Sequence, residues 1–186
     1  MLEKIIDFDK EAIVFLNNLG SETYDGLWLI ITKQLNWTPF FLFIFYLLQK
    51  KIGWKKFGYY ILFTAVLILI CDQTVNLFKY GFERLRPCNN PEIVDFLRID
   101  WKKSKSFSFF SGHATNSMAS TVFMFMILRK YYKHAYLLFL FPLIFAYSRI
   151  YLGLHFPTDI LTGYIFGATM GFVCYKLYEK FVIRNS

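Results

Sequence analysis

Long apolar runs, separated by short clusters of basic residues, organise this 186-residue chain. Four runs carry at most one charged residue each, and they cover residues 57–78, 113–128, 135–148 and 159–175. A fifth run, at about residues 30–49, needs Lys33 and Asn36 at its polar end. Repeated apolar runs of this kind are typical of helices that cross a bilayer. The pattern therefore predicts an all-α, polytopic membrane helical bundle with about five transmembrane helices.

A proline and three regularly spaced glycines predict further features of two of these helices. Pro142 lies inside the run 135–148 and predicts a kink there. Gly163, Gly167 and Gly171 recur at four-residue spacing in the last run. Glycines at this interval allow two helices to approach closely, so we expect the last helix to pack tightly on a neighbour.

The first 36 residues follow a different pattern. Residues 2–19 mix charged and bulky apolar side chains at helical spacing and end at Gly20. This predicts an amphipathic helix at the membrane surface, followed by a second surface-like stretch at 24–35. Acidic residues interrupt the N-terminus before a signal peptide could form. We expect one membrane-embedded domain over 1–186, with 1–36 as an interfacial segment whose path the sequence leaves open.

Composition supports the membrane class. Hydrophobic residues make up 56% of the chain, with 23 Phe and 13 Tyr, which is more apolar surface than a soluble core of this size needs. The net charge of +8 is concentrated in clusters between apolar runs, which favours anionic lipid or cytoplasmic membrane loops over nucleic acid as its explanation. Cys71 and Cys174 fall inside apolar runs and are expected to be buried hydrophobic residues. Neither a disulfide framework nor a zinc site is expected.

The basic clusters predict the orientation. They follow the first, third and fifth predicted helices, and they comprise Lys50, Lys51, Lys55 and Lys56, then Arg129, Lys130 and Lys133, then Lys176, Lys180 and Arg184. The positive-inside rule makes this side cytoplasmic. Three polar motifs fall on the opposite side, at the loop 79–112 and the turn before residue 159. That loop is itself basic, which opposes the rule, so we expect its cations to have anionic partners.

The first motif is Lys79-x6-Arg86-Pro87. Two helical turns would place Lys79 and Arg86 on one face, and Pro87 would end the helix at about Arg86. With Arg149 they could stabilise the charge of a phosphoryl group in a partly dehydrated site. Arg84 lies off that face and is interpreted as a membrane-anchoring cation. Asp72, Asn76 and Glu83 extend the same stripe, which could line the site or compensate charge within the helix. Compensation is expected of Glu83, and both interpretations stay open for Asp72.

The second and third motifs add the chemistry. Ser111-Gly112-His113 precedes an apolar helix, whose N-terminus suits phosphate, with Ser111 as cap and Gly112 allowing close backbone approach. In the third, Ser148-Arg149-x5-His155-x3-Asp159, a carboxylate could fix the tautomer of His155 and leave its other nitrogen free to attack. Two histidines, His113 and His155, could then divide the work of nucleophile and acid.

These three motifs, which span about 80 residues from Lys79 to Asp159, resemble those of the type 2 phosphatidic acid phosphatase superfamily. The apolar flanks resemble its membrane branch. The resemblance implies a helical bundle with the site at its non-cytoplasmic face and no metal or other cofactor. It further implies that His155 attacks phosphorus, oriented by Asp159, and that His113 protonates the leaving group. The phosphoryl oxygens would be held by Lys79, Arg86, Ser111, Gly112 and Arg149.

One position departs from the family pattern, because Phe110 stands where proline commonly precedes Ser-Gly-His. The change removes no chemical group, so activity is expected to persist. Similarity to small bacterial members implies the cytoplasmic membrane of a bacterium, with the site facing the periplasm or exterior. Their example makes a polyprenyl (undecaprenyl) diphosphate the leading substrate. The loop 88–110, with Trp101, Lys102, Lys103 and Lys105, is expected to meet the head group.

Other functions remain open. Lipid A phosphatase and phosphatidylglycerophosphate or phosphatidate phosphatase are close alternatives, since the motifs do not identify the lipid. A soluble haloperoxidase-like enzyme is disfavoured by five apolar runs. A non-enzymatic anion or lipid transporter could use the same cations, but it would have no need of an oriented nucleophile such as His155. The sequence does not indicate the oligomeric state.

Overall fold

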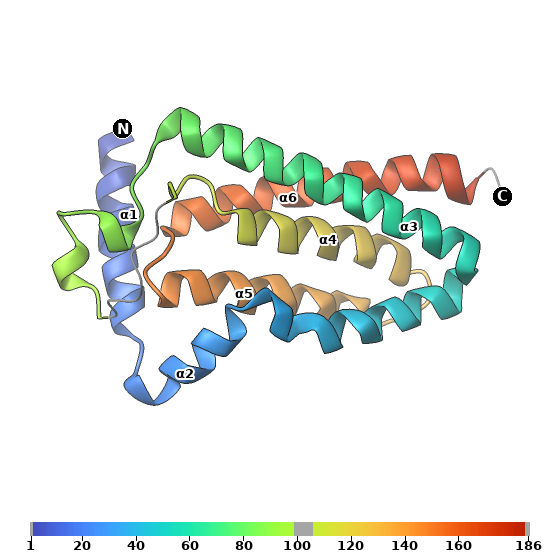
Figure 1. The fold of residues 1–186 in the computed structure, drawn as a ribbon, viewed down its shortest axis with the longest axis horizontal. Helices are drawn as coiled ribbons and strands as arrows, with labels where there is room; N and C mark the ends of the chain where they lie inside the picture. The colour runs from blue at the N-terminus through green and yellow to red at the C-terminus, as the bar shows by residue number, and fades with distance from the viewer. Residues whose placement is uncertain (1, 99–105, 185–186) are drawn as a thin grey trace.

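The computed structural model describes residues 2–98 and 106–184 of the chain. Four helices form a bundle, and two more lie at its edge (Figure 1). In chain order the α-helices are α1 (Leu2–Asn18), α2 (Glu22–Ile31), α3 (Thr38–Phe82), α4 (Gly112–Leu128), α5 (Leu140–Tyr151) and α6 (Pro157–Tyr178). Short 3-10 helices cover Gln34–Trp37, Pro87–Asn89, Val94–Phe96 and Ala135–Phe139, and a π-helical turn covers Glu179–Ile183. The predicted all-helical fold is confirmed for the described residues.

Helix α3 contains the predicted apolar run 57–78 and the later part of the run predicted at about residues 30–49. The first residues of that earlier run lie instead in α2 and in the 3-10 helix Gln34–Trp37. Gly53 interrupts it with φ 78° and ψ 165°, a conformation that glycine reaches without steric cost. The two arms on either side of Gly53 run in opposite directions (Figure 1). Pro39 lies in the first turn, where its missing N–H costs nothing. The chain therefore reverses direction at the basic cluster around Lys51. This cluster separates the predicted runs 30–49 and 57–78, so a turn was expected there.

Pro142 does not kink a helix, contrary to the prediction. The run 135–148 begins as the 3-10 helix Ala135–Phe139, and α5 starts only at Leu140. Pro142 thus occupies the first turn of α5, where its lack of an N–H breaks no helical hydrogen bond.

Helices α4 and α6 pack backbone against backbone. A Cβ atom added at Gly167 would lie 2.4 Å from the carbonyl oxygen of Thr115, and one at Gly171 would lie 2.4 Å from that of Ala119. At Gly163 it would lie 2.8 Å from the carbonyl oxygen of Ser111. No side chain fits at these distances, so the predicted close approach of the glycine face is confirmed.

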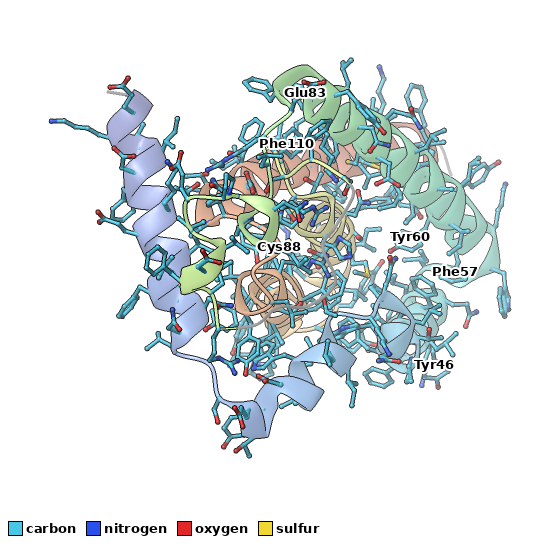
Figure 2. All side chains as sticks on the ribbon, turned by 60° about the vertical axis from the view of Figure 1, so that its left-hand side comes forward. Tyr46, Phe57, Tyr60, Glu83, Cys88 and Phe110 are labelled. Carbon is cyan, nitrogen blue, oxygen red and sulfur yellow. The ribbon has the colours of Figure 1, made fainter. Side chains whose placement is uncertain are left out.

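The rest of the bundle packs around aromatic side chains. Tyr60 of α3 is fully buried, with its ring 4.9 Å from that of Phe123 and stacked on Phe57 at 6.0 Å (Figure 2). Tyr178 is also fully buried, and its hydroxyl donates to the carbonyl of Lys56 at 2.8 Å. Cys71 lies in the same cluster, which confirms its interpretation as a buried hydrophobic residue.

The outer surface of the bundle is apolar. Large exposed side chains cover α3 and α6, among them Leu42, Leu62, Leu69, Leu77, Leu161 and Ile165. The segments Gln34–Asn89 and Pro157–Ile183 are long and apolar enough to cross a bilayer. Such a surface on a helical bundle fits contact with lipid rather than water.

Helices α1 and α2 close one end of the bundle. Helix α1 lies across that end, and α2 leads from it back to α3 (Figure 1). The Asp25 carboxylate of α2 accepts hydrogen bonds from both Arg98 terminal nitrogens, at 2.7 and 3.2 Å, and from the Tyr151 hydroxyl at 2.6 Å. The Arg98 guanidinium lowers the pKa of Asp25, so this carboxylate stays ionised and ties α2 to α5.

Candidate active site

The three sequence motifs meet at the end of the bundle that α1 covers. The end of α3, the start of α4 and the turn between α5 and α6 lie together there (Figure 1). Backbone hydrogen bonds join them directly: Ser111 N–H donates to the carbonyl of Asp159 at 3.1 Å, and Cys88 N–H to that of Gly153 at 3.0 Å. The predicted convergence of the motifs on one side is therefore confirmed. The basic segments around Gly53, after α4 and at the C-terminus lie at the opposite end.

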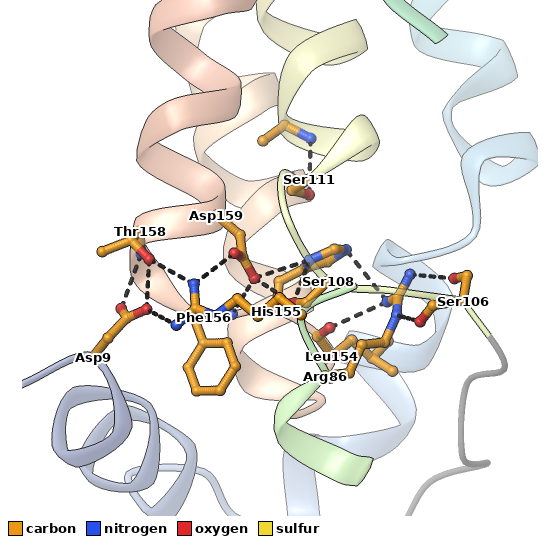
Figure 3. Close-up of polar contacts among 12 residues, drawn as sticks. Asp9, Arg86, Ser106, Ser108, Ser111, Leu154, His155, Phe156, Thr158 and Asp159 are labelled. Carbon is orange, nitrogen blue, oxygen red and sulfur yellow. Dashed lines mark hydrogen bonds and ion pairs between the residues drawn. The ribbon is translucent and has the colours of Figure 1, made fainter. Parts of the chain in front are cut away.

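His155 and Asp159 form a buried pair. His155 ends the turn before α6, and Asp159 lies in the first helical turn, with exposed fractions of 1% and 0%. His155 Nδ1 lies 3.4 Å from Asp159 Oδ2, which also accepts from the backbone N–H of Phe156 at 2.9 Å (Figure 3). The Ser108 hydroxyl donates to the same oxygen. Two donors besides the imidazole thus hold this carboxylate oxygen in place.

Burial keeps the imidazole of His155 uncharged. Loss of water lowers the pKa of His155 to about 3, although the hydrogen bond to Asp159 opposes this shift. A neutral imidazole that donates from Nδ1 to a carboxylate has its lone pair on Nε2. Nε2 is therefore the nitrogen of this histidine that carries the available lone pair.

Arg86 lies beside that nitrogen, with Nη1 3.3 Å from His155 Nε2. The residue is 5% exposed. Its guanidinium donates to the carbonyl of Ser106 at 2.9 Å, to the Ser106 hydroxyl at 2.8 Å and to the carbonyl of Leu154 at 3.1 Å (Figure 3). These contacts hold the planar cation beside Nε2 of His155.

Arg86 reaches this place from a loop, not from a helix face, so the predicted two-turn alignment with Lys79 is wrong. Helix α3 ends at Phe82, and Glu83 follows in the left-handed conformation with φ 47°. Arg86 is extended, with ψ 155°, because the residue before a proline avoids helical geometry. None of the ion pairs among the described residues involves Glu83, so the charge compensation expected of it within α3 is not seen.

Arg84 is not a membrane-anchoring cation, and that interpretation is corrected. Its Nη1 donates to Asp159 Oδ1 at 2.8 Å and to the Thr158 hydroxyl at 2.9 Å, and its Nη2 donates to Asp9 Oδ2 at 2.6 Å. The guanidinium also stacks on the Phe156 ring at 3.9 Å. Arg84 therefore links α1 to the carboxylate that faces His155.

Lys79 and His113 line a cavity of about 310 Å³ between α3 and α4, together with Gly112. His113 interacts electrostatically with Lys79, Arg86, Arg149 and His155, so the predicted cations and both histidines share one site. A Cβ at Gly112 would meet only Val75, at 3.5 Å. Packing alone does not require glycine there, and its free backbone faces the cavity.

Ser111 caps α4 as predicted. Its buried hydroxyl accepts from the backbone N–H of Ala114 at 3.4 Å. Arg149, near the end of α5, donates from Nη1 to the Thr32 hydroxyl at 2.5 Å. Its buried Nε has no hydrogen-bond partner in the part of the chain that the structure describes. Arg149 thus retains an unused donor beside the two histidines.

Sequence reasoning missed Asp9, Thr32, Ser106 and Ser108. The serines precede the Ser-Gly-His motif closely enough to be suspected as part of it. Asp9 and Thr32 carried no such signal, since both lie far from the motifs in the chain. Trp101, Lys102, Lys103 and Lys105, expected to meet the head group, lie outside the described residues.

Comparison with known proteins agrees with this fold. The family model of the PAP2 superfamily matches residues 56–183. A lipid A 4'-phosphatase of Bacteroides thetaiotaomicron is 32% identical over 99% of this chain and 83% of its own length. An undecaprenyl-diphosphatase of Sulfolobus acidocaldarius is 24% identical over 94% of this chain and 81% of its own. The crystal structure of a transmembrane PAP2-type phosphatidylglycerolphosphate phosphatase from Bacillus subtilis superposes with a TM-score of 0.73 at 21% identity, covering 96% of this chain and 88% of that one.

The helical fold and the motif-bearing site define a membrane phosphatase. The chain belongs to the PAP2 superfamily, whose type 2 phosphatidic acid phosphatase motifs it carries. It is accordingly a phosphoric ester hydrolase that acts at the membrane on lipid phosphates.

Proposed function

We propose that the protein removes a phosphate from a phosphorylated glycolipid such as lipid A, through a phosphohistidine formed on His155. The observation that carries the mechanism is the buried pair of His155 and Asp159, with Nε2 of His155 next to Arg86 at 3.3 Å. An imidazole held in one tautomer, with its free nitrogen facing a cation, is arranged for nucleophilic attack rather than for binding alone. This argues against the transporter alternative.

In the first step, His155 Nε2 bonds to phosphorus and the P–O bond to the lipid breaks. His113 protonates the departing oxygen, and Asp159 stabilises the positive charge that develops on His155. In the second step, water attacks the phosphohistidine, His113 accepts a proton from that water, and inorganic phosphate leaves. Lys79, Arg86 and Arg149 stabilise the charge on the phosphoryl oxygens in both steps.

Ser111 and Gly112 would complete the phosphate site. The Ser111 oxygen accepts a hydrogen bond within the cap of α4, which leaves its hydroxyl proton for a phosphoryl oxygen. Gly112 leaves room for the phosphate to approach the first amides of α4, where the helix carries partial positive charge.

The glycolipid substrate is supported by the lipid A 4'-phosphatase that is 32% identical over nearly the whole chain. A polyprenyl diphosphate, the substrate that the sequence alone favoured, is the second candidate. It is supported by the undecaprenyl-diphosphatase, which is more distant at 24% identity.

We further propose that about five transmembrane helices place the site at the non-cytoplasmic face of a bacterial cytoplasmic membrane, with α1 and α2 at the interface. The basic clusters at the opposite end support this orientation. The basic loop before α4 is compatible with it, because Arg84 pairs with Asp9 and Arg98 with Asp25. A membrane-impermeant thiol reagent should label Glu92→Cys in intact cells and should not label Lys133→Cys.

The mechanism is tested by phosphate release from lipid A in detergent. His155→Ala should abolish turnover, whereas His134→Ala, an exposed histidine of the same chain, should retain it. Brief incubation of the wild type with radiolabelled substrate should trap an acid-labile, base-stable phosphoenzyme. Undiminished turnover by His155→Ala would contradict the proposal. A chelator should leave the rate unchanged, and its loss on chelation would contradict a metal-free mechanism.

A further inference from the structure

The cavity beside His113 continues past the phosphate site, between α3 and α4. Along α3 it is lined by Lys79, Asn76 and Asp72 in turn, and along α4 by His113 and Asn116. A rise of about 1.5 Å per residue places Asp72 about 10 Å below Lys79 and Asn116 about 4.5 Å below His113. The cavity therefore has a polar wall well inside the bundle, where polar side chains are costly and usually functional.

This polar wall presents hydrogen-bond acceptors. Asn116 donates from Nδ2 to Asp72 Oδ1 at 2.6 Å, which fixes the two side chains across the cavity. The side-chain amide oxygen of Asn116, Oδ1, is buried and has no hydrogen-bond partner among the described residues. The Asp72 carboxylate can only accept hydrogen bonds, and the Asn116 amide oxygen is free to accept one. The wall is therefore suited to a ligand that donates hydrogen bonds.

The position of the cavity identifies which part of a substrate would enter it. In the proposed reaction His113 protonates the leaving oxygen, so the group that carries the phosphate lies on the His113 side. His155, on the attacking side, is not part of this cavity lining. The acceptors of Asp72 and Asn116 therefore face the carrier group and not the phosphate.

We propose that Asp72 and Asn116 form a recognition subsite for a carrier group with hydroxyl or amide N–H donors, as on an acylated amino-sugar ring. This inference rests on the proposed function, since it assumes that His113 faces the leaving group. An ionised polyprenyl diphosphate offers no donor and would bring negative charge toward Asp72. A diacylglycerol phosphate offers no donor either. The subsite thus selects a glycolipid over both.

The lower end of the cavity accounts for the acyl chains. It is lined by Ile68, Phe41 and Phe141, and it shares Phe41 and Gln34 with a second hollow of about 550 Å³. The second hollow includes Leu42, whose side chain is 63% exposed on the outer surface of α3. An apolar path from the sugar subsite to the bilayer is what an acylated ring needs.

The test compares two phosphate monoesters in mixed detergent micelles, lipid A and phosphatidate. Asn116→Leu and Asp72→Leu should each lower kcat/KM for lipid A by about 10- to 100-fold, mainly through KM, as loss of a hydrogen bond to a polar or charged group predicts. The same variants should leave kcat/KM for phosphatidate within about threefold, because phosphatidate makes no such bond. Asp72→Asn, which keeps an acceptor, should lose less than Asp72→Leu.

Gln73→Leu is the matched control, since Gln73 follows Asp72 in α3, is exposed and does not line the cavity. It should behave as the wild type on both lipids. Equal losses on both lipids, or unchanged kinetics on lipid A, would overturn the subsite. A wild type that cleaves phosphatidate or undecaprenyl diphosphate but not lipid A would also overturn the subsite. That result would leave the phosphohistidine mechanism intact. A wild type that releases phosphate from none of these lipids would overturn the proposed function itself.

Discussion

Asp9 near the N-terminus and Asp159 at the start of α6 are held by the same guanidinium. Arg84 donates to Asp9 Oδ2 at 2.6 Å and to Asp159 Oδ1 at 2.8 Å. Both carboxylates are buried, with exposed fractions of 1% and 0%. Asp9 also accepts from the backbone N–H of Thr158 at 3.0 Å. The helix that crosses the end of the bundle is thereby joined to the carboxylate that orients His155.

Replacing Arg84 should therefore impair catalysis through Asp159, and not through loss of a contact with the substrate. Arg84→Gln leaves two buried carboxylates without their cation, so the protein should lose about 3–5 kcal/mol of stability. Displacement of Asp159, and with it His155, should lower kcat by about 100-fold while KM changes little. Steady-state kinetics and thermal unfolding in detergent measure the two effects. Arg84→Lys should restore part of kcat, because it keeps the charge.

Lys10→Gln is the control for Arg84. Lys10 also joins α1 to the loop after α3, through an ion pair with Glu92, but Glu92 is exposed and this pair does not include Asp159. An exposed pair contributes about 0–1 kcal/mol, so kcat should not change. If Arg84→Gln altered KM alone, Arg84 would act on substrate binding and not on the position of Asp159.

The glycine face of α6 should not accept even a methyl group. In Gly167→Ala the new Cβ would lie 2.4 Å from a backbone oxygen of α4, which cannot rotate away. Separation of α4 and α6 should cost about 1–3 kcal/mol, and activity should fall because the two helices carry His113 and Asp159. Thermal unfolding in detergent, with phosphate release in parallel, measures this.

Gly58→Ala provides the contrast, since nothing lies within 4 Å of a Cβ at that position of α3. Alanine there should be neutral or stabilise by up to about 1 kcal/mol, through its higher helix propensity. Equal stability of Gly167→Ala and Gly58→Ala would show that the α4–α6 contact is looser than described.

The contact between α2 and the bundle should depend on pH through Asp25. Arg98 lowers the pKa of Asp25 in the folded protein below its unfolded value of about 3.9. The unfolded chain then binds the proton first, so the stabilisation is complete above about pH 4 and is lost as pH falls through the lower folded pKa. The difference in Tm between wild type and Asp25→Asn should be constant from about pH 7 to pH 5 and shrink below about pH 4. Arg98→Gln should remove the same pH-dependent difference, and a difference that grew on acidification would contradict the assignment.

Local patterns were enough to predict much of this molecule. The apolar runs located the helices of the bundle, and their order placed His113, Arg149 and His155 at one end. The spacing of Gly163, Gly167 and Gly171 predicted a tight helix contact because that spacing is itself a property of one helix face.

Contacts between distant segments could not be predicted in the same way. Asp9 was one of several charges on an amphipathic helix, and nothing nearby in the chain marked it as buried. Its partner Arg84 lies 75 residues away, in a loop whose path depends on the left-handed turn at Glu83. Pro142 likewise predicts a kink only if an α-helix begins well before it. Because a 3-10 helix precedes α5, Pro142 lies in the first turn of α5 instead.

The backbone contact between α4 and α6 also has a mechanical meaning. His113 lies in the first turn of α4, and His155 lies just before the start of α6. These two helices are in direct backbone contact at Gly163, Gly167 and Gly171. In a thicker or thinner bilayer, α4 and α6 would tilt together as one rigid body. Tilting the pair has a modest free-energy cost, whereas separating the two helices would break their packing. The spacing between His155 and His113 would then stay constant while the surrounding lipid changes.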